Sequence, residues 1–235
     1  MKIETILSPS LFHQISDIEQ KAVVVIDILR ATSTIVTILN NGASSVIPVK
    51  EEEDALIYQS QGYLVGGERG GETIPGFDFG NSPFQYSSEL VNNKDVVLTT
   101  TNGTKCLEMS KNAKYVFTGA FLNLNILVDH IKTLNRDVVL FCAGWKDKVN
   151  LEDSLFAGAV AHLFPKAEID DATLLCKHSY ELTSSNIFEA LKGSNHFLRL
   201  AGKGVIRDIE YCCMLNKIEI VPELKNGKLI SRKLI

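Results

Sequence analysis

The chain has 235 residues, of which 45% are hydrophobic and 22% charged, proportions ordinary for a globular protein with a sizeable core. Its net charge of −4 at pH 7 argues against general nucleic-acid binding, and no apolar run reaches the ~20 residues that span a membrane. The five cysteines form no CxxC pair. We therefore expect neither a disulfide framework nor a zinc site, and the cytoplasm as the compartment.

Apolar runs of strand length alternate with segments of helical period, the pattern of an α/β fold. Predicted strands cover residues 22–27, 45–49, 63–66, 95–99, 115–118, 137–142 and 219–221. Predicted helices cover residues 15–19, 33–40, 51–60, 108–111 with flanks, 122–133, 152–163, 171–180 and 187–191. We expect a three-layer α/β/α fold with a mixed sheet in one domain, residues 1–235.

Two segments repeat the same order of elements. Residues 21–49 and 94–118 each read as strand, polar turn, helix and strand, and a third strand-to-helix unit starts at residue 137. This repeat predicts two similar lobes from a duplication, with the active site between them. Open α/β sheets bind ligands at the carboxyl ends of their strands, so the polar turns are the candidate sites.

The first polar turn carries one acidic residue, Asp27, and one basic residue, Arg30. Asp27 ends an apolar strand, where it suits a metal ligand, base or nucleophile, and the alternative is a helix cap or a partner for Arg30. Arg30 can hold phosphate oxygens in a fork, or form a structural ion pair. The hydroxyls of Thr32, Ser33 and Thr34 follow and complete a candidate anion site.

The second polar turn, TTTNGT at residues 99–104, joins hydroxyls, a glycine and the free N–H groups of a helix start. That combination suits an anion, above all a phosphate. The residues expected to cradle it are Thr100, Thr101, Asn102, Gly103 and Thr104.

Further candidates lie in a glycine-rich segment and at a helix start. Glu68 and Arg69 offer an oxygen donor and a cation between glycine pairs, or an exposed ion pair in a tight turn. Asn81 either braces a helix or joins the site. Glu152 and Asp153 suit either the helix dipole or a hard cation such as Mg²⁺.

The histidines show no metal-binding spacing. None of the five lies in an HxH or HExxH motif or in a Cys/His cluster. We expect them to be surface or hydrogen-bonded histidines.

Five motifs in fixed order carry a family resemblance. They are VIDILRATST (25–34), GER (67–69), GFDFGNSP (76–83), TTTNGT (99–104) and CAG (142–144). Together they resemble the 2-phosphosulfolactate phosphatase family of coenzyme M biosynthesis over nearly the whole chain. The likeness continues weakly through Glu152, Asp153, the segment 194–196 and Asp208.

The resemblance implies a Mg²⁺-dependent phosphatase that converts 2-phosphosulfolactate to 3-sulfolactate and inorganic phosphate. In this hypothesis Asp27, Arg30 and Glu68 are catalytic, and Asp27, Glu68, Glu152 and Asp153 hold the metal. The residues expected to bind substrate are Thr32, Ser33, Thr34, Arg69, Asn81, Thr100, Thr101, Asn102, Gly103 and Thr104.

Other functions stay open at this point. The chain could be a binding module for a phosphorylated or sulfonated small acid, a phosphatase of another phospho-hydroxyacid, or an isomerase or aldolase acting on a phosphosugar-like acid. Each takes a small anionic partner, and a homo-oligomer is compatible with the sequence.

Overall fold

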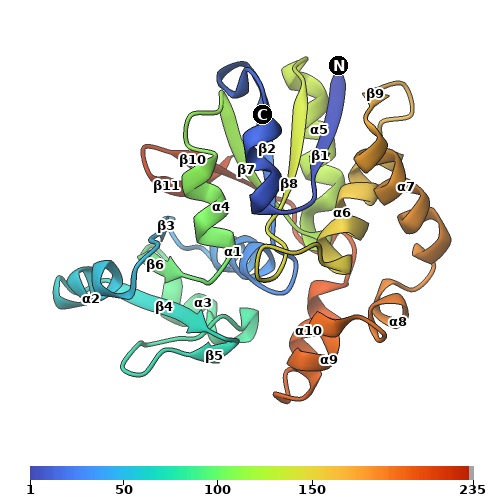
Figure 1. Ribbon diagram of the computed structural model, residues 1–235. Coiled ribbons are helices and arrows are strands. Elements are labelled where there is room, and N and C mark those ends of the chain that lie inside the picture. The colour runs from blue at the N-terminus through green and yellow to red at the C-terminus, as the bar shows by residue number, and fades with distance from the viewer. Residues whose placement is uncertain (233–235) are drawn as a thin grey trace.

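The computed structural model describes residues 1–232 (Figure 1). Eleven strands form one sheet in the order β5-β4-β6-β3-β11-β10-β7-β2-β8-β1-β9. The strands are β1 (Lys2–Ile6), β2 (Ala22–Ile26), β3 (Ser45–Pro48), β4 (Leu64–Arg69), β5 (Glu72–Thr73), β6 (Asp95–Thr99), β7 (Tyr115–Gly119), β8 (Val138–Cys142), β9 (Glu168–Ile169), β10 (Val221–Lys225) and β11 (Lys228–Arg232). The expected mixed sheet in an α/β fold is confirmed.

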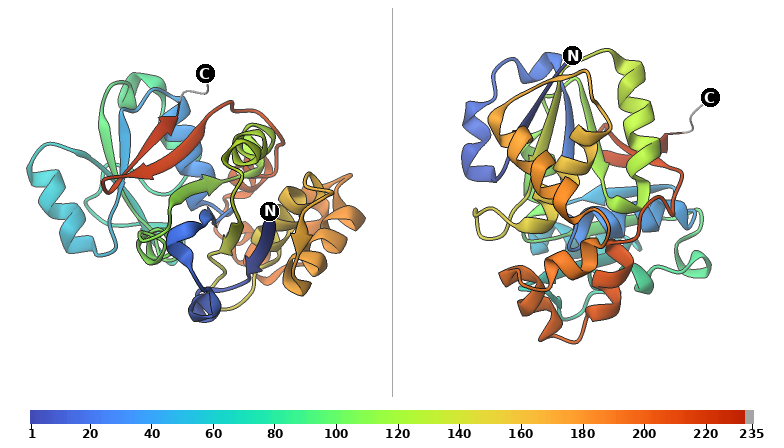
Figure 2. Two further views of the ribbon diagram at one scale, coloured as in Figure 1. Left: turned by 90° about the horizontal axis from the view of Figure 1, so that it is seen from above. Right: turned by 90° about the vertical axis from the view of Figure 1, so that its right-hand side faces the viewer.

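A C-terminal hairpin joins two groups of parallel strands. The first group is β3, β4 and β6, and the second is β1, β2, β7, β8 and β9. The hairpin β10–β11 runs antiparallel to both, pairing Glu223 with Phe117 and Leu229 with Val46. Figure 2 (left) shows it, in red, between the two groups. The two groups of parallel strands therefore belong to one sheet.

The two repeated units cross between these groups in opposite directions. The unit β2–α1–β3, with α1 at Ala31–Asn40, leads from the second group to the first, and β6–α4–β7, with α4 at Gly103–Met109, leads back. The turns after β2 and β6 meet, because a Cβ on Gly103 would lie 2.9 Å from Asp27 Oδ2. Descent of the two units from a duplication stays a prediction.

Helices cover both faces of the sheet. Along β2, Val24 and Ile26 pack in a cluster with α5 (Leu124–Leu134) and α6 (Leu151–His162), whereas Val23 and Val25 pack in a second cluster with α1 and α4. This alternation is what a strand buried on two sides requires. The other helices are α2 (Glu52–Ser60), α3 (Ser88–Val91), α7 (Asp171–Thr183), α8 (Ile187–Leu191), α9 (Asn195–Ala201) and α10 (Ile206–Cys212).

Several elements differ from the sequence expectation. The helix expected at residues 15–19 is wrong, because Asp17 adopts a left-handed conformation and only a short 3-10 turn follows at Ile18–Gln20. The strand expected at 219–221 begins at Val221 and extends into the hairpin. β1, α3, α9 and α10 were not anticipated, since short segments with charged residues show little periodicity.

Within residues 1–232, no helix is both long and apolar enough to span a bilayer.

The hairpin should matter for the stability of the whole sheet. Leu229 is fully buried in β11, so Leu229→Ala should lower the free energy of unfolding by about 3 kcal/mol through lost burial and a cavity. Urea unfolding measures this, with Leu182→Ala as the control, because Leu182 is 85% exposed. A loss for Leu229→Ala as small as that of the control would show that the hairpin contributes little.

Candidate active site

A cavity of about 330 Å³ opens where the carboxyl ends of strands from both groups meet α9. Its volume lies in the range typical of small-molecule sites. Its lining comprises Asp27, Leu29, Arg30, Glu68, Gly70, Gly71, Asn81, Thr101, Asn102, Trp145, Lys146, His196, Arg199, Leu200 and Lys203. Asp27, Arg30 and Glu68, the three predicted catalytic residues, therefore share one cavity.

Asp27 is a buried acid at the end of an apolar strand. All five residues of β2 are buried, and Asp27 follows directly with 7% of its surface exposed. Burial is the main cause that raises the pKa of Asp27 from 3.8 to about 7; the neighbouring His196 opposes this rise, and the charges of Glu68 and Glu152 contribute to it. This carboxyl can therefore exchange a proton near neutral pH.

The turn at 99–104 binds an anion, and this anion is the carboxylate of Glu68 in the same protein. The N–H of Thr101 donates to Glu68 Oε1 at 2.8 Å, and the N–H of Gly71 donates to Glu68 Oε2 at 2.6 Å. Thr100 Oγ1 accepts from the N–H of Thr104 (3.2 Å), and Thr104 Oγ1 donates back to the carbonyl of Thr100 (2.8 Å). The turn thus anchors Glu68 and leaves Thr101 and Asn102 on the cavity wall.

Asp153 links two turns through hydrogen bonds. Its carboxylate accepts from the N–H of Ile28 at 2.9 Å and of Gly144 at 3.0 Å. These N–H groups follow β2 and β8, so one side chain fixes the ends of two neighbouring strands. Burial raises the pKa of Asp153 well above its ordinary value, and the charges of Glu152 and Asp27 add to this. Glu152 and Asp153 are buried behind the cavity lining rather than in it.

Arg30 forms the ion pair that was one of its two expected roles, and it also lines the cavity. It forms a buried ion pair with Asp208 of α10, and Ser82 Oγ donates to the other oxygen of Asp208 at 3.0 Å. Arg30 also lines the cavity and reaches the carbonyl of Gly71 at 3.4 Å. Because a guanidinium has five N–H donors, the ion pair leaves donors for a ligand.

Arg69 does not join the predicted substrate site. Its Nε pairs with Glu52 Oε1 at 3.0 Å, and its Nη2 donates to the carbonyl of Lys50 and to Thr99 Oγ1. Arg69 is absent from the lining of the cavity. The expectation that Arg69 binds substrate is not supported, because its bonds to Glu52 of α2 and Thr99 at the end of β6 hold its side chain outside the cavity lining.

The hydroxyls after Asp27 shape the turn instead of facing the cavity. Thr32 Oγ1 accepts from the N–H of Asp27 (3.2 Å), and Ser33 Oγ donates to the carbonyl of Ile28 (2.9 Å). Thr34 Oγ1 donates to the carbonyl of Asn81 (3.0 Å). None of the three lines the cavity. Their placement fits local support of the turn better than the predicted direct contact with substrate.

Sequence reasoning missed the part of the cavity lining that residues 145–146 and α9 supply. His196 was expected to be an ordinary histidine, yet it lines the cavity, is 6% exposed and bonds through Nδ1 to Glu152. Trp145, Lys146 and Arg199 lie beside it. The weak motif at 194–196 was the only sequence signal, because these residues lie on a loop and a short helix without recognisable spacing.

No ready-made metal centre of three or more His, Cys, Asp or Glu side chains occurs within residues 1–232. The four acids expected to bind a metal nevertheless interact electrically: Glu68 and Glu152 raise the pKa of Asp27, and Glu152 and Asp27 raise that of Asp153. Their metal-binding role stays a prediction.

Known proteins align with this chain along almost its full length. The family described as 2-phosphosulpholactate phosphatase matches residues 6–227. This chain belongs to that family. A protein of Thermotoga petrophila, described as "Probable 2-phosphosulfolactate phosphatase", is 41% identical over 218 residues, which are 93% of this chain and 95% of that protein. Proteins with the same description from Carboxydothermus hydrogenoformans (40% identical, 98% of this chain and 97% of that protein) and Clostridium tetani (37%, 97% and 99%) agree.

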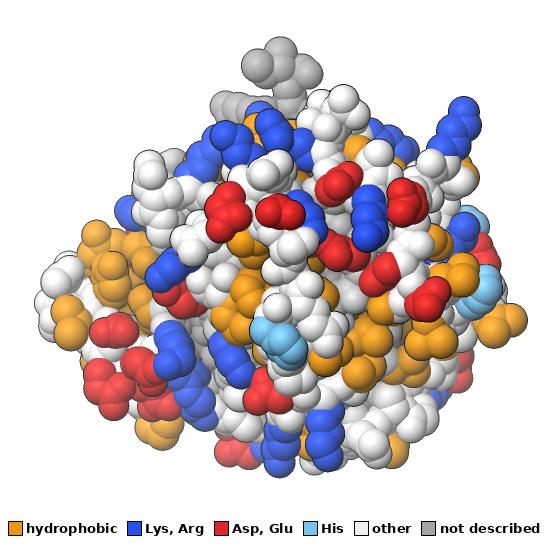
Figure 3. Space-filling model, turned by 45° about the horizontal axis from the view of Figure 1, so that its top comes forward, with side chains coloured by type: hydrophobic (Ala, Val, Ile, Leu, Met, Phe, Trp, Pro, Cys, Tyr) orange, Lys and Arg blue, Asp and Glu red, His pale blue; other side chains and the backbone are white. Residues whose placement is uncertain are grey.

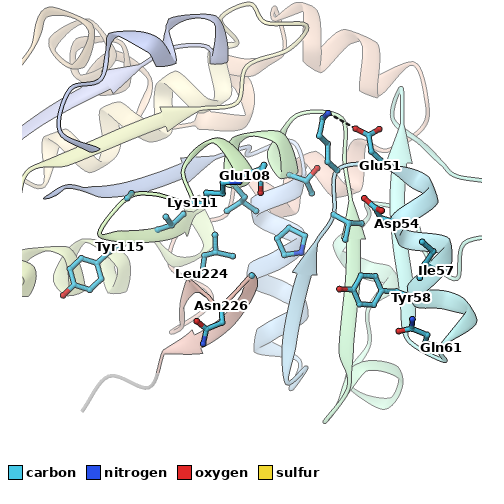
Figure 4. Close-up of a pocket in the computed structure, with 18 of the residues that line it drawn as sticks. Glu51, Asp54, Ile57, Tyr58, Gln61, Glu108, Lys111, Tyr115, Leu224 and Asn226 are labelled. Carbon is cyan, nitrogen blue, oxygen red and sulfur yellow. Dashed lines mark hydrogen bonds and ion pairs between the residues drawn. The ribbon is translucent and has the colours of Figure 1, made fainter. Parts of the chain in front are cut away.

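The family's phosphoric monoester hydrolase chemistry fits the smaller cavity and not the larger groove of about 970 Å³ between α2, α4 and the β10–β11 turn (Figure 4). The charged residues that line the groove are all exposed, and one of its ion pairs joins Lys50 to Glu51 at 2.7 Å. On the face in Figure 3, hydrophobic and acidic side chains adjoin at the left edge, over α2. The hydrogen bond from Lys50 lowers the pKa of Glu51 there, whereas the acid of the cavity, Asp27, has a raised pKa, as catalytic acids often have.

Gly103 should be needed for the approach of the two turns. A Cβ there would lie 2.7 Å from the Cβ of Ala31 and 2.9 Å from Asp27 Oδ2. We expect Gly103→Ala to cost about 2 kcal/mol of stability through overpacking and to lower kcat about tenfold through displacement of Asp27. Thermal melts and initial rates measure both effects.

The matched control is Gly193→Ala, because a Cβ on Gly193 meets no atom within 4 Å. Equal behaviour of the two variants would contradict the close approach.

Asp27 should make the stability of the metal-free protein depend on pH. Because its pKa is about 7 when folded and 3.8 ordinarily, the folded state holds a proton that the unfolded chain has released, and stability falls as pH rises from about 4 to 7. In EDTA, Asp27→Asn should therefore gain up to about 4 kcal/mol relative to the parent across that interval. Denaturant unfolding at pH 4 to 8 measures it, and parallel curves for the two proteins would show an ordinary Asp27.

Proposed function

We propose that this protein hydrolyses 2-phosphosulfolactate to 3-sulfolactate and inorganic phosphate, with Mg²⁺ as its cofactor. The observation that carries the proposal is Asp27, a buried acid with a raised pKa that faces a cavity of ligand size in a member of this family. The substrate carries phosphate, carboxylate and sulfonate groups. The cavity has the cations to receive them: Arg30, Lys146, Arg199 and Lys203.

The donor set fits Mg²⁺. This ion prefers oxygen ligands and is commonly bound by one or two carboxylates together with substrate phosphate and water. Glu152 Oε2 is buried and has no hydrogen-bond partner among residues 1–232. Both oxygens of Glu68 and of Asp153 accept backbone N–H groups, and Glu152 lies outside the cavity lining, so we assign Mg²⁺ chiefly to Asp27, with the charge of Glu152 close by.

Bound Mg²⁺ would neutralise charge on the phosphate oxygens as the P–O bond breaks. The chain's own residues orient the substrate. Arg30, fixed by Asp208, holds phosphate oxygens with its remaining donors, and Asn102 borders the same space. Glu68 holds the two loops that form this wall, through Gly71 and Thr101.

Asp27 supplies the reactive carboxylate. Two roles fit its position, attack on phosphorus and activation of water. Rapid quench followed by mass analysis distinguishes them, since only the first leaves a phosphorylated Asp27.

Phosphate release tests the function. We expect 2-phosphosulfolactate to be hydrolysed faster than phospholactate or phosphoglycolate, activity to vanish in EDTA, and Mg²⁺ to restore it. Asp27→Asn should lower kcat about 10³-fold, because it removes the reactive carboxylate.

Arg69→Met is the control, since Arg69 lies outside the cavity. Binding of the acids without phosphate release from any of them would identify a binding module instead. Faster turnover of a substrate without sulfonate would identify a phosphatase of another phospho-hydroxyacid.

A further inference from the structure

The four cations of the cavity fall into two classes. Arg30 is paired with Asp208, and Lys203 is paired with Glu72. Arg199 and Lys146 form no ion pair with any carboxylate among residues 1–232. These two are therefore the positive charges of the cavity that still lack a counter-charge.

Arg199 is held in one orientation by neighbours from different parts of the chain. Its Nη1 donates to the carbonyl of Gly70 at 2.8 Å, and its Nη2 lies 2.9 Å from His196 Nε2. Its guanidinium carbon also lies 5.1 Å from the ring centre of Trp145. A guanidinium fixed in this way loses little further freedom when a ligand binds.

The neighbours of His196 fix its tautomer. Because arginine has only donors, His196 Nε2 must accept from Arg199, and Nδ1–H must donate to Glu152. The imidazole stacks on Trp145, with ring centres 5.7 Å apart and planes inclined by 7°. Glu152, His196 and Trp145 are thus positioning residues for Arg199.

Arg199 lines the cavity and keeps donors that bond to no protein acceptor among residues 1–232. Two of its five N–H groups are used, and its Nε is buried with no hydrogen-bond partner among residues 1–232. A buried unpaired N–H costs about 1–3 kcal/mol until an acceptor arrives. The exposed cation Lys146 lies near the same ring, with its Nζ 4.9 Å from the ring centre of Trp145.

We propose that Arg199, supported by Lys146, binds the sulfonate of the substrate and sets the preference for sulfonated over plain phospho-hydroxyacids. This inference rests on the proposed function. The phosphate belongs beside Asp27 and Arg30, which share one turn, and Arg199 reaches the cavity from a different element, α9. A sulfonate spreads one charge over three oxygens and is weakly hydrated, which suits a weakly hydrated guanidinium stacked on an indole.

The test compares two substrates that differ only at the sulfonate. In phospholactate a methyl group replaces the sulfomethyl group of 2-phosphosulfolactate. Arg199→Met should lower kcat/KM for 2-phosphosulfolactate about 100-fold and leave that for phospholactate within about threefold, because a methyl group makes no bond to Arg199. Arg199→Lys should recover part of the loss, since it keeps the charge and loses the fork.

The matched control is Arg207→Met. Arg207 is an exposed arginine on α10, stacked on Phe84 at 4.2 Å and outside the cavity. It should leave the kinetics of both substrates unchanged. If Arg199→Met fails to fold, Arg199→Lys carries the comparison, and its melting temperature is checked against that of Arg207→Met.

A binding measurement separates this inference from the function. By calorimetry, the parent should bind sulfolactate more tightly than lactate, and Arg199→Met should abolish that difference. Equal losses on both substrates, or an unchanged preference for sulfolactate, would overturn the role of Arg199. A parent that releases no phosphate but still distinguishes sulfolactate from lactate through Arg199 would instead overturn the phosphatase function.

Discussion

The burial of four carboxylates around one small volume is the constraint on which the rest of the structure depends. Isolated charges in a protein interior are strongly destabilising unless hydrogen bonds or opposite charges compensate them. Glu68 and Asp153 are compensated by backbone N–H groups, and Glu152 by His196. Asp27, the acid that lines the cavity, is only partly compensated, and its pKa rises to about 7. The acid that faces the cavity thus titrates near neutral pH.

The same carboxylates explain why turns distant in sequence converge. Asp153 joins the turns after β2 and β8, and Glu68 joins the β4–β5 turn to the turn after β6. The hairpin β10–β11 keeps the two strand groups in one sheet, which lets these bonds form (Figure 2). The hydrogen bonds at the strand ends and the strand pairing in the middle of the sheet therefore stabilise the same arrangement of the turns around the cavity.

The site has two unlike sides. Beside Asp27 the polar groups are already bonded within the protein, so the ligand meets fixed donors and a reactive acid. Elsewhere along the cavity, Arg199 and Lys146 lie beside Trp145 and form no ion pair with a carboxylate among residues 1–232. A substrate with a phosphate at one end and a second strong acid at the other matches that division. Fixed donors also favour catalysis, since they need no reorganisation as charge develops.

The sequence by itself determined the α/β class, the strands β2, β6 and β8 within a residue, and the turn that carries Asp27 and Arg30. It could do so because buried strands, polar turns and helix starts leave local patterns. Only the tertiary structure decided that Glu68 occupies the turn at 99–104, that Arg69 pairs with Glu52, and that α9 supplies part of the cavity lining. The physical reason is that a side chain's partner depends on its position in three dimensions: the turn attracts an anion, but only the fold brings the Glu68 carboxylate to it first.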